Sequence, residues 1–114
     1  MPKWMILALI LFGVIAAGCL FGLSGDLDSA KAHELVGGGA TLVDVRSAEE
    51  YQGGHIDGAI NVPVSELASR LAEIPKDKPV VVYCHSGMRS SKAKTVLRDA
   101  GYKDVYDLGA MSRW

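Results

Sequence analysis

The sequence predicts an α/β domain with a three-layer α/β/α architecture and a central parallel sheet of about five strands. Three observations predict this fold. Apolar strand-like runs alternate with helical patterns between residues 41 and 108, as in a parallel sheet covered by helices on both faces. Residues 80–83 are uninterruptedly apolar, as expected for a central strand. The length of 114 residues is enough for one compact domain.

Capping and strand signals predict the elements of the first half. In order, these are a helix, a strand, a brief helix and a strand over residues 29–36, 41–45, 47–51 and 59–62. Either Asp28 or Ser29 can cap the first helix, and three glycines end it. The brief helix opens on a capping box, because Ser47 stands three residues before Glu50. Pro63 ends the second strand.

Periodicity predicts the elements of the second half. They are a helix, a strand, a helix and a strand over residues 65–74, 80–83, 90–100 and 105–108. Apolar residues recur at helical spacing in both helices, and Gly101 ends the second one. Such sheets bind ligands at the carboxyl ends of their parallel strands, so the residues that follow each strand are candidate site residues.

Residues 1–25 are predicted to be a membrane anchor or signal segment, which leaves residues 26–114 as the globular domain. Residues 4–23 form an uncharged apolar run of 20 residues, long enough to cross a bilayer as a helix. Lys3 precedes this run and two aspartates follow it, so the positive-inside rule places the domain on the extracytoplasmic side of the membrane. Association with a membrane through residues 4–23 is therefore expected.

A second interpretation of this segment is a lipoprotein signal. Residues 15–19 resemble a lipobox that ends at Cys19, which would then carry a lipid. Ala16 stands where leucine is usual, and the residues after Cys19 remain apolar. Plain secretion is a third interpretation, and the sequence does not decide among the three.

Charge and cysteine usage exclude other classes. The net charge is −1, so there is no basic excess that would favour a nucleic-acid partner. The two cysteines, Cys19 and Cys84, stand in very different surroundings and do not form a disulfide framework.

Cys84 directly follows the predicted central strand and opens a tight loop into a helix. Such a loop aims several backbone N–H groups into one concavity, and the helix dipole adds to this anion-binding field. Gly87 can adopt the positive φ that a tight loop requires, and Arg89 adds a permanent positive charge. The field stabilises the thiolate form of Cys84, so this arrangement indicates a nucleophile.

Two chemistries use this geometry. In one the thiolate attacks a phosphorus or arsenic centre, and in the other it accepts a sulfane sulfur as a persulfide. Phosphate needs a longer loop than the four residues that separate Cys84 from Arg89. The spacing therefore favours sulfur.

At this point the chain resembles the rhodanese family of single-domain sulfurtransferases. The resemblance covers four blocks in the expected order. They are residues 42–51 (Leu-Val-Asp-Val-Arg with Glu-Tyr), residues 54–63 (Gly-His-Ile-Asp-Gly-Ala-Ile-Asn-Val-Pro), residues 81–90 around Cys84, and a closing block of Tyr102, Val105, Leu108, Gly109 and Trp114. The family usually continues past this tryptophan into a last helix.

The resemblance implies a mechanism. The Cys84 thiolate would take the outer sulfur of a donor such as thiosulfate, and a thiophilic acceptor, cyanide or a thiol, would remove it. No metal or organic cofactor is implied, and a monomer is expected. A non-enzymatic sulfur carrier or binding module that works with a membrane partner is the alternative. The segment before residue 29 is expected to supply a short edge strand.

Each candidate site residue has an expected role. Cys84 is the catalytic residue, and the loop after it is expected to bind the substrate through His85, Ser86, Gly87, Met88 and Arg89. Arg89 is expected to attract an anionic donor. Asp44 and Arg46 form a possible rim of the site, although a structural ion pair explains them equally well. Ser90 is expected to cap the following helix.

Overall fold

The computed structural model describes residues 25–114, so the anchor or signal interpretations of residues 4–23 lie outside the described residues, and Cys19 with them. The elements are α2 (Ser29–Gly37), β1 (Thr41–Asp44), α3 (Ala48–Gln52), β2 (Ile60–Asn61), η2 (Leu67–Ser69), η3 (Leu71–Glu73), β3 (Val80–Cys84), α4 (Met88–Asp99), β4 (Val105–Ala110) and η4 (Met111–Arg113). None of the helices between residues 25 and 114 combines the length and apolar character needed to cross a membrane.

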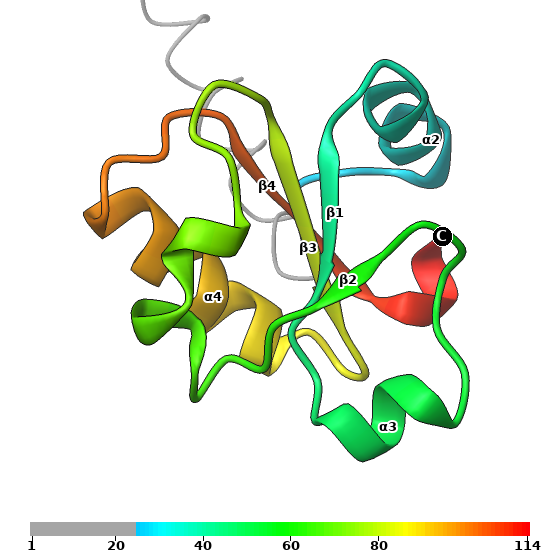
Figure 1. Cartoon of the computed structure of the whole chain (residues 1–114). Coiled ribbons are helices and arrows are strands. Elements are labelled where there is room, and N and C mark those ends of the chain that lie inside the picture. Colours follow the sequence, from blue (N-terminus) through cyan, green and yellow to red (C-terminus); the bar gives the residue numbers. More distant parts are fainter. Residues whose placement is uncertain (1–24) are drawn as a thin grey trace, which may run out of the picture.

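The sheet is parallel, with the strand order β2-β1-β3-β4 (Figure 1). Its four strands confirm the predicted parallel α/β fold, with one strand fewer than the expected five or so. Residues 25–28, the described residues before α2, form no strand. They contribute one backbone hydrogen bond beside β4, in which the Asp26 N–H donates to the Asp107 carbonyl over 2.6 Å.

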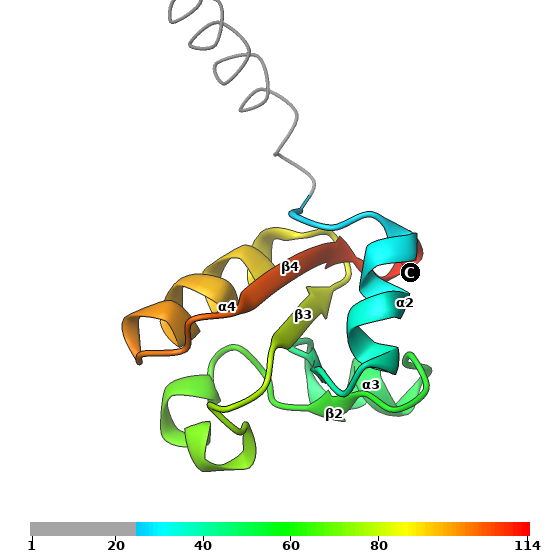
Figure 2. The same ribbon diagram turned by 90° about the horizontal axis from the view of Figure 1, so that it is seen from above.

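Two apolar clusters hold the helical layers to the sheet. On one face, α4 and the turns η2 and η3 pack on strand residues such as Val43 and Val82 through side chains such as Leu97 and Leu67. On the other face, α2 and the chain termini of the domain pack on Leu42 and Leu108, among others. Helices α2 and α4 thus lie on opposite sides of the strands (Figure 2). Within residues 25–114, the two clusters cover both faces of the sheet, as in a domain that folds by itself.

The predicted helix over residues 65–74 is wrong. Two 3₁₀ turns, η2 and η3, replace it, and their hydrogen bonds run from each N–H to the carbonyl three residues earlier, as from Arg70 to Leu67. Arg70 separates the turns with φ −122° and ψ 23°, outside the α region. Leu67 and Ile74 are buried in this arrangement. The apolar pattern therefore predicted which residues are buried, but not the type of helix.

Most other bounds differ by one or two residues. Asp28 caps α2 by accepting from the Lys31 N–H, and the capping box of Ser47 and Glu50 opens α3 as predicted. Helix α4 starts at Met88, two residues earlier than predicted, because Gly87 and not Ser90 is its N-cap. All carboxyl ends of the strands point the same way, so the loop after β1 and the loop after β3 meet at one edge (Figure 1).

Candidate active site

Cys84 is the last residue of β3 and its side chain is buried. The Gly87 N–H donates a hydrogen bond to Cys84 Sγ over 2.9 Å. The thiol itself lies 3.4 Å from Ser90 Oγ, to which it donates. The sulfur therefore sits in a polar cradle formed by the loop and the first turn of α4. A cradle of donors next to a helix N-terminus stabilises a negative charge on sulfur.

Gly87 turns the chain from the strand into the helix. Its φ of 101° lies in the left-handed region, which an L side chain rarely adopts. This conformation directs the Gly87 N–H at the sulfur and starts α4 at the next residue. The predicted need for glycine at this position is confirmed.

Substituting Gly87 by alanine is expected to slow sulfur uptake by about tenfold or more, because the backbone donor would move away from Cys84. The added Cβ has space, with Gly109 Cα nearest at 3.9 Å, so the cost is backbone strain of about 1–2 kcal/mol. Rapid-quench measurement of persulfide formation, with urea unfolding alongside, tests this expectation. The control is Gly37→Ala, where no atom lies within 4 Å of the new Cβ. Equal uptake rates in the two variants would contradict it.

The mouth of the site is formed by the loop and the start of α4. His85 and Ser86 are exposed, and Met88 is 80% exposed. A cavity of about 340 Å³ is lined by Ser86, Gly87, Met88 and Ser91. One of these lining residues, Gly87, also donates its N–H to Cys84 Sγ.

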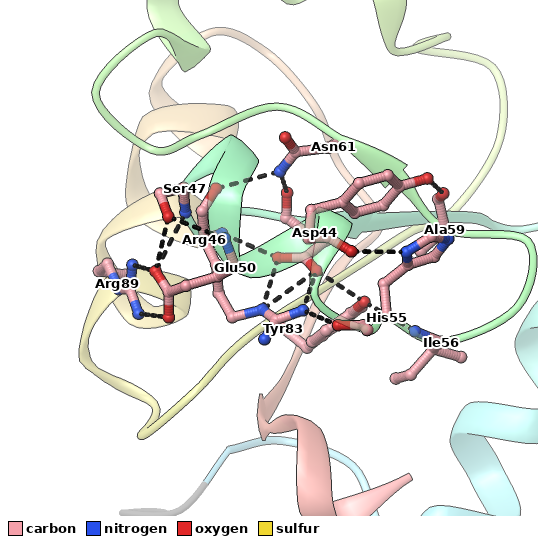
Figure 3. Close-up of polar contacts among 12 residues, drawn as sticks. Asp44, Arg46, Ser47, Glu50, His55, Ile56, Ala59, Asn61, Tyr83 and Arg89 are labelled. Carbon is pink, nitrogen blue, oxygen red and sulfur yellow. Dashed lines mark hydrogen bonds and ion pairs between the residues drawn. The ribbon is translucent and has the colours of Figure 1, made fainter.

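Arg89, which follows Met88 in α4, pairs with Glu50 (Figure 3). Its Nη1 and Nη2 donate to the two carboxylate oxygens of Glu50 over 2.7 and 3.0 Å. The hydrogen bonds from Arg89, followed by the one from the Ser47 N–H, lower the pKa of Glu50 to about 2. Arg89 is thus ion-paired with Glu50, and the expectation that it attracts an anionic donor stays a prediction. Sequence reasoning identified Glu50 only as a helix cap.

Asp44 and Arg46 are buried, with 0% and 5% exposure, and do not line an open rim. Arg46 Nε donates to Asp44 Oδ1 over 3.0 Å, and its Nη2 donates to Oδ2 and to the Gly54 carbonyl, both over 2.7 Å. Hydrogen bonding to Asp44 raises the pKa of Arg46. The structural ion pair considered from the sequence is thus the arrangement found, and it ties the end of β1 to the loop after α3 (Figure 3).

Tyr83 joins this pair to the central strand. Its hydroxyl donates to Asp44 Oδ2 over 2.9 Å and accepts from the Ile56 N–H over 3.1 Å. Burial, with a further contribution from the hydrogen bond and charge of Asp44, raises the pKa of Tyr83 to about 12. Tyr83, which directly precedes Cys84, therefore holds in place the segment before α3 at Asp44 and the segment after α3 at Ile56.

Replacing Tyr83 by phenylalanine is expected to lower the free energy of unfolding by about 1–3 kcal/mol at pH 7, because two buried partners lose the hydroxyl. The folded-state pKa lies above the unfolded value, so the Tyr83 hydroxyl stabilises fully below pH 10 and less as the pH rises toward 12. The variant should therefore lose less stability than the parent between those pH values. Urea unfolding at pH 7 and pH 11 measures both effects, and identical alkaline losses would contradict the assignment.

Ser90 is not the helix cap that the sequence predicted. It is buried in the first turn of α4, where its hydroxyl accepts from the Cys84 thiol and donates to the Gly87 carbonyl over 3.1 Å. When the thiol loses its proton, this hydroxyl can rotate and donate to the sulfur. The only signal in the sequence was its position directly after the loop, which is also where a helix cap is expected.

A family model described as Rhodanese-like domain matches residues 28–114. The chain belongs to the rhodanese-like family. The resemblance seen in the four sequence blocks is thereby confirmed over nearly the whole described part of the chain. The loop that cradles Cys84 lies within the matched residues.

Similar proteins include sulfurtransferases. Thiosulfate sulfurtransferase PspE of Escherichia coli is 42% identical over 71 residues, which cover 60% of this chain and 68% of PspE. The structure titled Human Single Domain Sulfurtranferase TSTD1 superposes with a TM-score of 0.67 at 35% identity, over 77% of this rhodanese-like chain and 92% of TSTD1. These relatives support sulfur transfer as the class of chemistry, in agreement with the predicted rhodanese-type enzyme.

Another relative has no assigned activity. The Uncharacterized protein YqhL of Bacillus subtilis is 46% identical over 76 residues, which cover 66% of this rhodanese-like chain. The matched part spans 60% of YqhL, less than two thirds of its length. Relatives of this kind establish the domain.

Proposed function

We propose that the protein is a sulfurtransferase that moves a sulfane sulfur from a donor such as thiosulfate to a thiophilic acceptor, cyanide or a thiol. The observation that carries the proposal is the cradle around Cys84, in which the Gly87 N–H donates to Sγ over 2.9 Å. A buried sulfur that accepts from a backbone amide beside a helix N-terminus is prepared to carry negative charge, as both a thiolate and a persulfide require.

The reaction has two balanced steps. In the first, the Cys84 thiolate attacks the outer sulfur of thiosulfate, a new S–S bond forms, and sulfite leaves with the electron pair of the broken S–S bond. In the second, cyanide or a thiolate attacks the outer sulfur of the persulfide, and the Cys84 thiolate leaves. Gly87 holds the sulfur in place in both steps. The Ser90 hydroxyl lies 3.4 Å from Cys84 Sγ and can rotate to donate to it when the thiol has lost its proton.

Intact mass spectrometry of residues 25–114 tests the proposal. This segment carries apolar clusters on both faces of its sheet and a single cysteine, so any added sulfur reports on Cys84. Thiosulfate should add one sulfur atom, and cyanide should then remove it as thiocyanate. Uptake without release to cyanide or to thiols would favour a sulfur carrier. Absence of uptake from thiosulfate and from persulfide donors would refute sulfur transfer.

A further inference from the structure

We infer that Glu50 determines the donor specificity of this site, because its ion pair with Arg89 withholds that cation from the donor. The site should then discriminate against thiosulfate, which carries two negative charges, relative to a low-molecular-weight persulfide that is neutral or singly charged. This inference rests on the proposed function, since it concerns the donor step of the same Cys84.

Two hydrogen bonds hold the side chains of Glu50 and Arg89 together. Glu50 Oε1 accepts from Arg89 Nη1 over 2.7 Å and from the Ser47 hydroxyl over 3.0 Å, and Glu50 Oε2 accepts from Arg89 Nη2 over 3.0 Å. The pair is bidentate, the arrangement in which an arginine and a carboxylate bind each other most specifically. Glu50 is itself held by the capping box, so the carboxylate is fixed where Arg89 meets it.

Arg89 is nevertheless near the sulfur in the fold, because it stands in the first turn of α4, two residues after Gly87, whose N–H donates to Cys84 Sγ over 2.9 Å. The hydrogen bonds that Arg89 donates to Glu50 raise its pKa most, and the charges of Glu50 and of an ionised Cys84 raise it in smaller part. Arg46, the other arginine that acts on Arg89, is itself paired with Asp44. Each arginine of these two loops is therefore neutralised by one carboxylate. The attraction left for a donor comes from the Gly87 N–H and the start of α4.

The two classes of donor differ in charge but give the same product. From thiosulfate, Cys84 gains the outer sulfur and sulfite leaves with the bonding electrons. From a persulfide R–S–SH, Cys84 gains the outer sulfur with its proton and the thiolate R–S⁻ leaves. Coulomb energy scales with the product of the charges, so an unmasked Arg89 would favour the dianion most. The intact pair removes most of this preference.

The variant Glu50→Gln tests the inference, because it removes the negative charge with little change of shape. In single-turnover loading of residues 25–114, the second-order rate constant with thiosulfate should rise about three- to fivefold at low salt. The gain should shrink in about 0.5 M salt, where charges are screened. Loading from an alkyl persulfide should change by less than about twofold. The double variant E50Q/R89Q should lose the gain.

Ser47→Ala is the matched control, since it loosens the capping box and leaves both charges of the pair in place. Its ratio of thiosulfate to persulfide loading should equal that of the parent. If Glu50→Gln slowed both donors equally, as a loosened loop would, the specificity role would be overturned. The parent protein supplies a test that needs no variant: its thiosulfate loading should depend only weakly on salt, and a steep decline would reveal a free Arg89. Failure of the parent to load from either donor would refute the proposed function itself.

Discussion

Replacing Cys84 by serine is expected to abolish sulfur uptake, with a decrease of about 10⁴-fold or more in turnover with thiosulfate and cyanide. The hydroxyl of serine is a far weaker nucleophile at neutral pH, and it cannot hold the transferred sulfur as a persulfide. The substitution should leave the fold intact, because serine is close to cysteine in size and Ser90 Oγ is near enough to bond it. Thiocyanate formation and intact mass after thiosulfate treatment measure the effect.

A matched control for this variant is Thr95→Ser, on the exposed face of α4. It should load one sulfur atom at the parent rate. Urea unfolding of both variants shows whether any loss of activity reflects loss of structure. Sulfur transfer that persisted in Cys84→Ser at more than a small fraction of the parent rate would contradict the assignment of the nucleophile.

The fold was predictable where local chemistry and burial agree. Val80, Val81 and Val82 are buried on both faces of the sheet. A continuous run of β-branched residues in a small domain is typical of a strand that is buried on both faces. The capping box of Ser47 and Glu50 was predictable because both partners are three residues apart. The 3₁₀ turns of residues 67–73 were not, because buried residues four or seven apart fit an α-helix and two successive turns alike.

The position of Cys84 was predictable from its place after the central strand, but the partners of the loop were not. Arg89 and Glu50 are 39 residues apart, and their contact depends on how the loops after β1 and β3 meet. The same holds for Tyr83 and Asp44, whose hydrogen bond joins neighbouring strands. Pairings of this kind are set by tertiary structure, so periodicity and spacing carry no signal of them.

Replacing Asp44 by asparagine is expected to lower the free energy of unfolding by about 3–5 kcal/mol. Asp44 accepts from the Arg46 backbone N–H, from the Arg46 guanidinium and from the Tyr83 hydroxyl, and its side chain is fully buried. Asparagine has nearly the same shape but no charge, so the buried Arg46 cation would lose its counter-ion and face an amide that is partly a donor. The melting temperature should fall by about 12 °C or more.

The exposed pair of Lys31 and Glu34 provides the control, because its side chains are 52% and 72% exposed and 3.6 Å apart. Glu34→Gln should change the free energy of unfolding by at most about 0.5 kcal/mol, since water replaces the lost partner. Urea unfolding of both variants gives the comparison. A loss in Asp44→Asn no greater than in Glu34→Gln would mean that apolar packing alone holds the loops around Cys84. A large loss would show that the buried pair at the end of β1 holds them, and sulfur uptake measured on the fraction that remains folded would then be slowed as well.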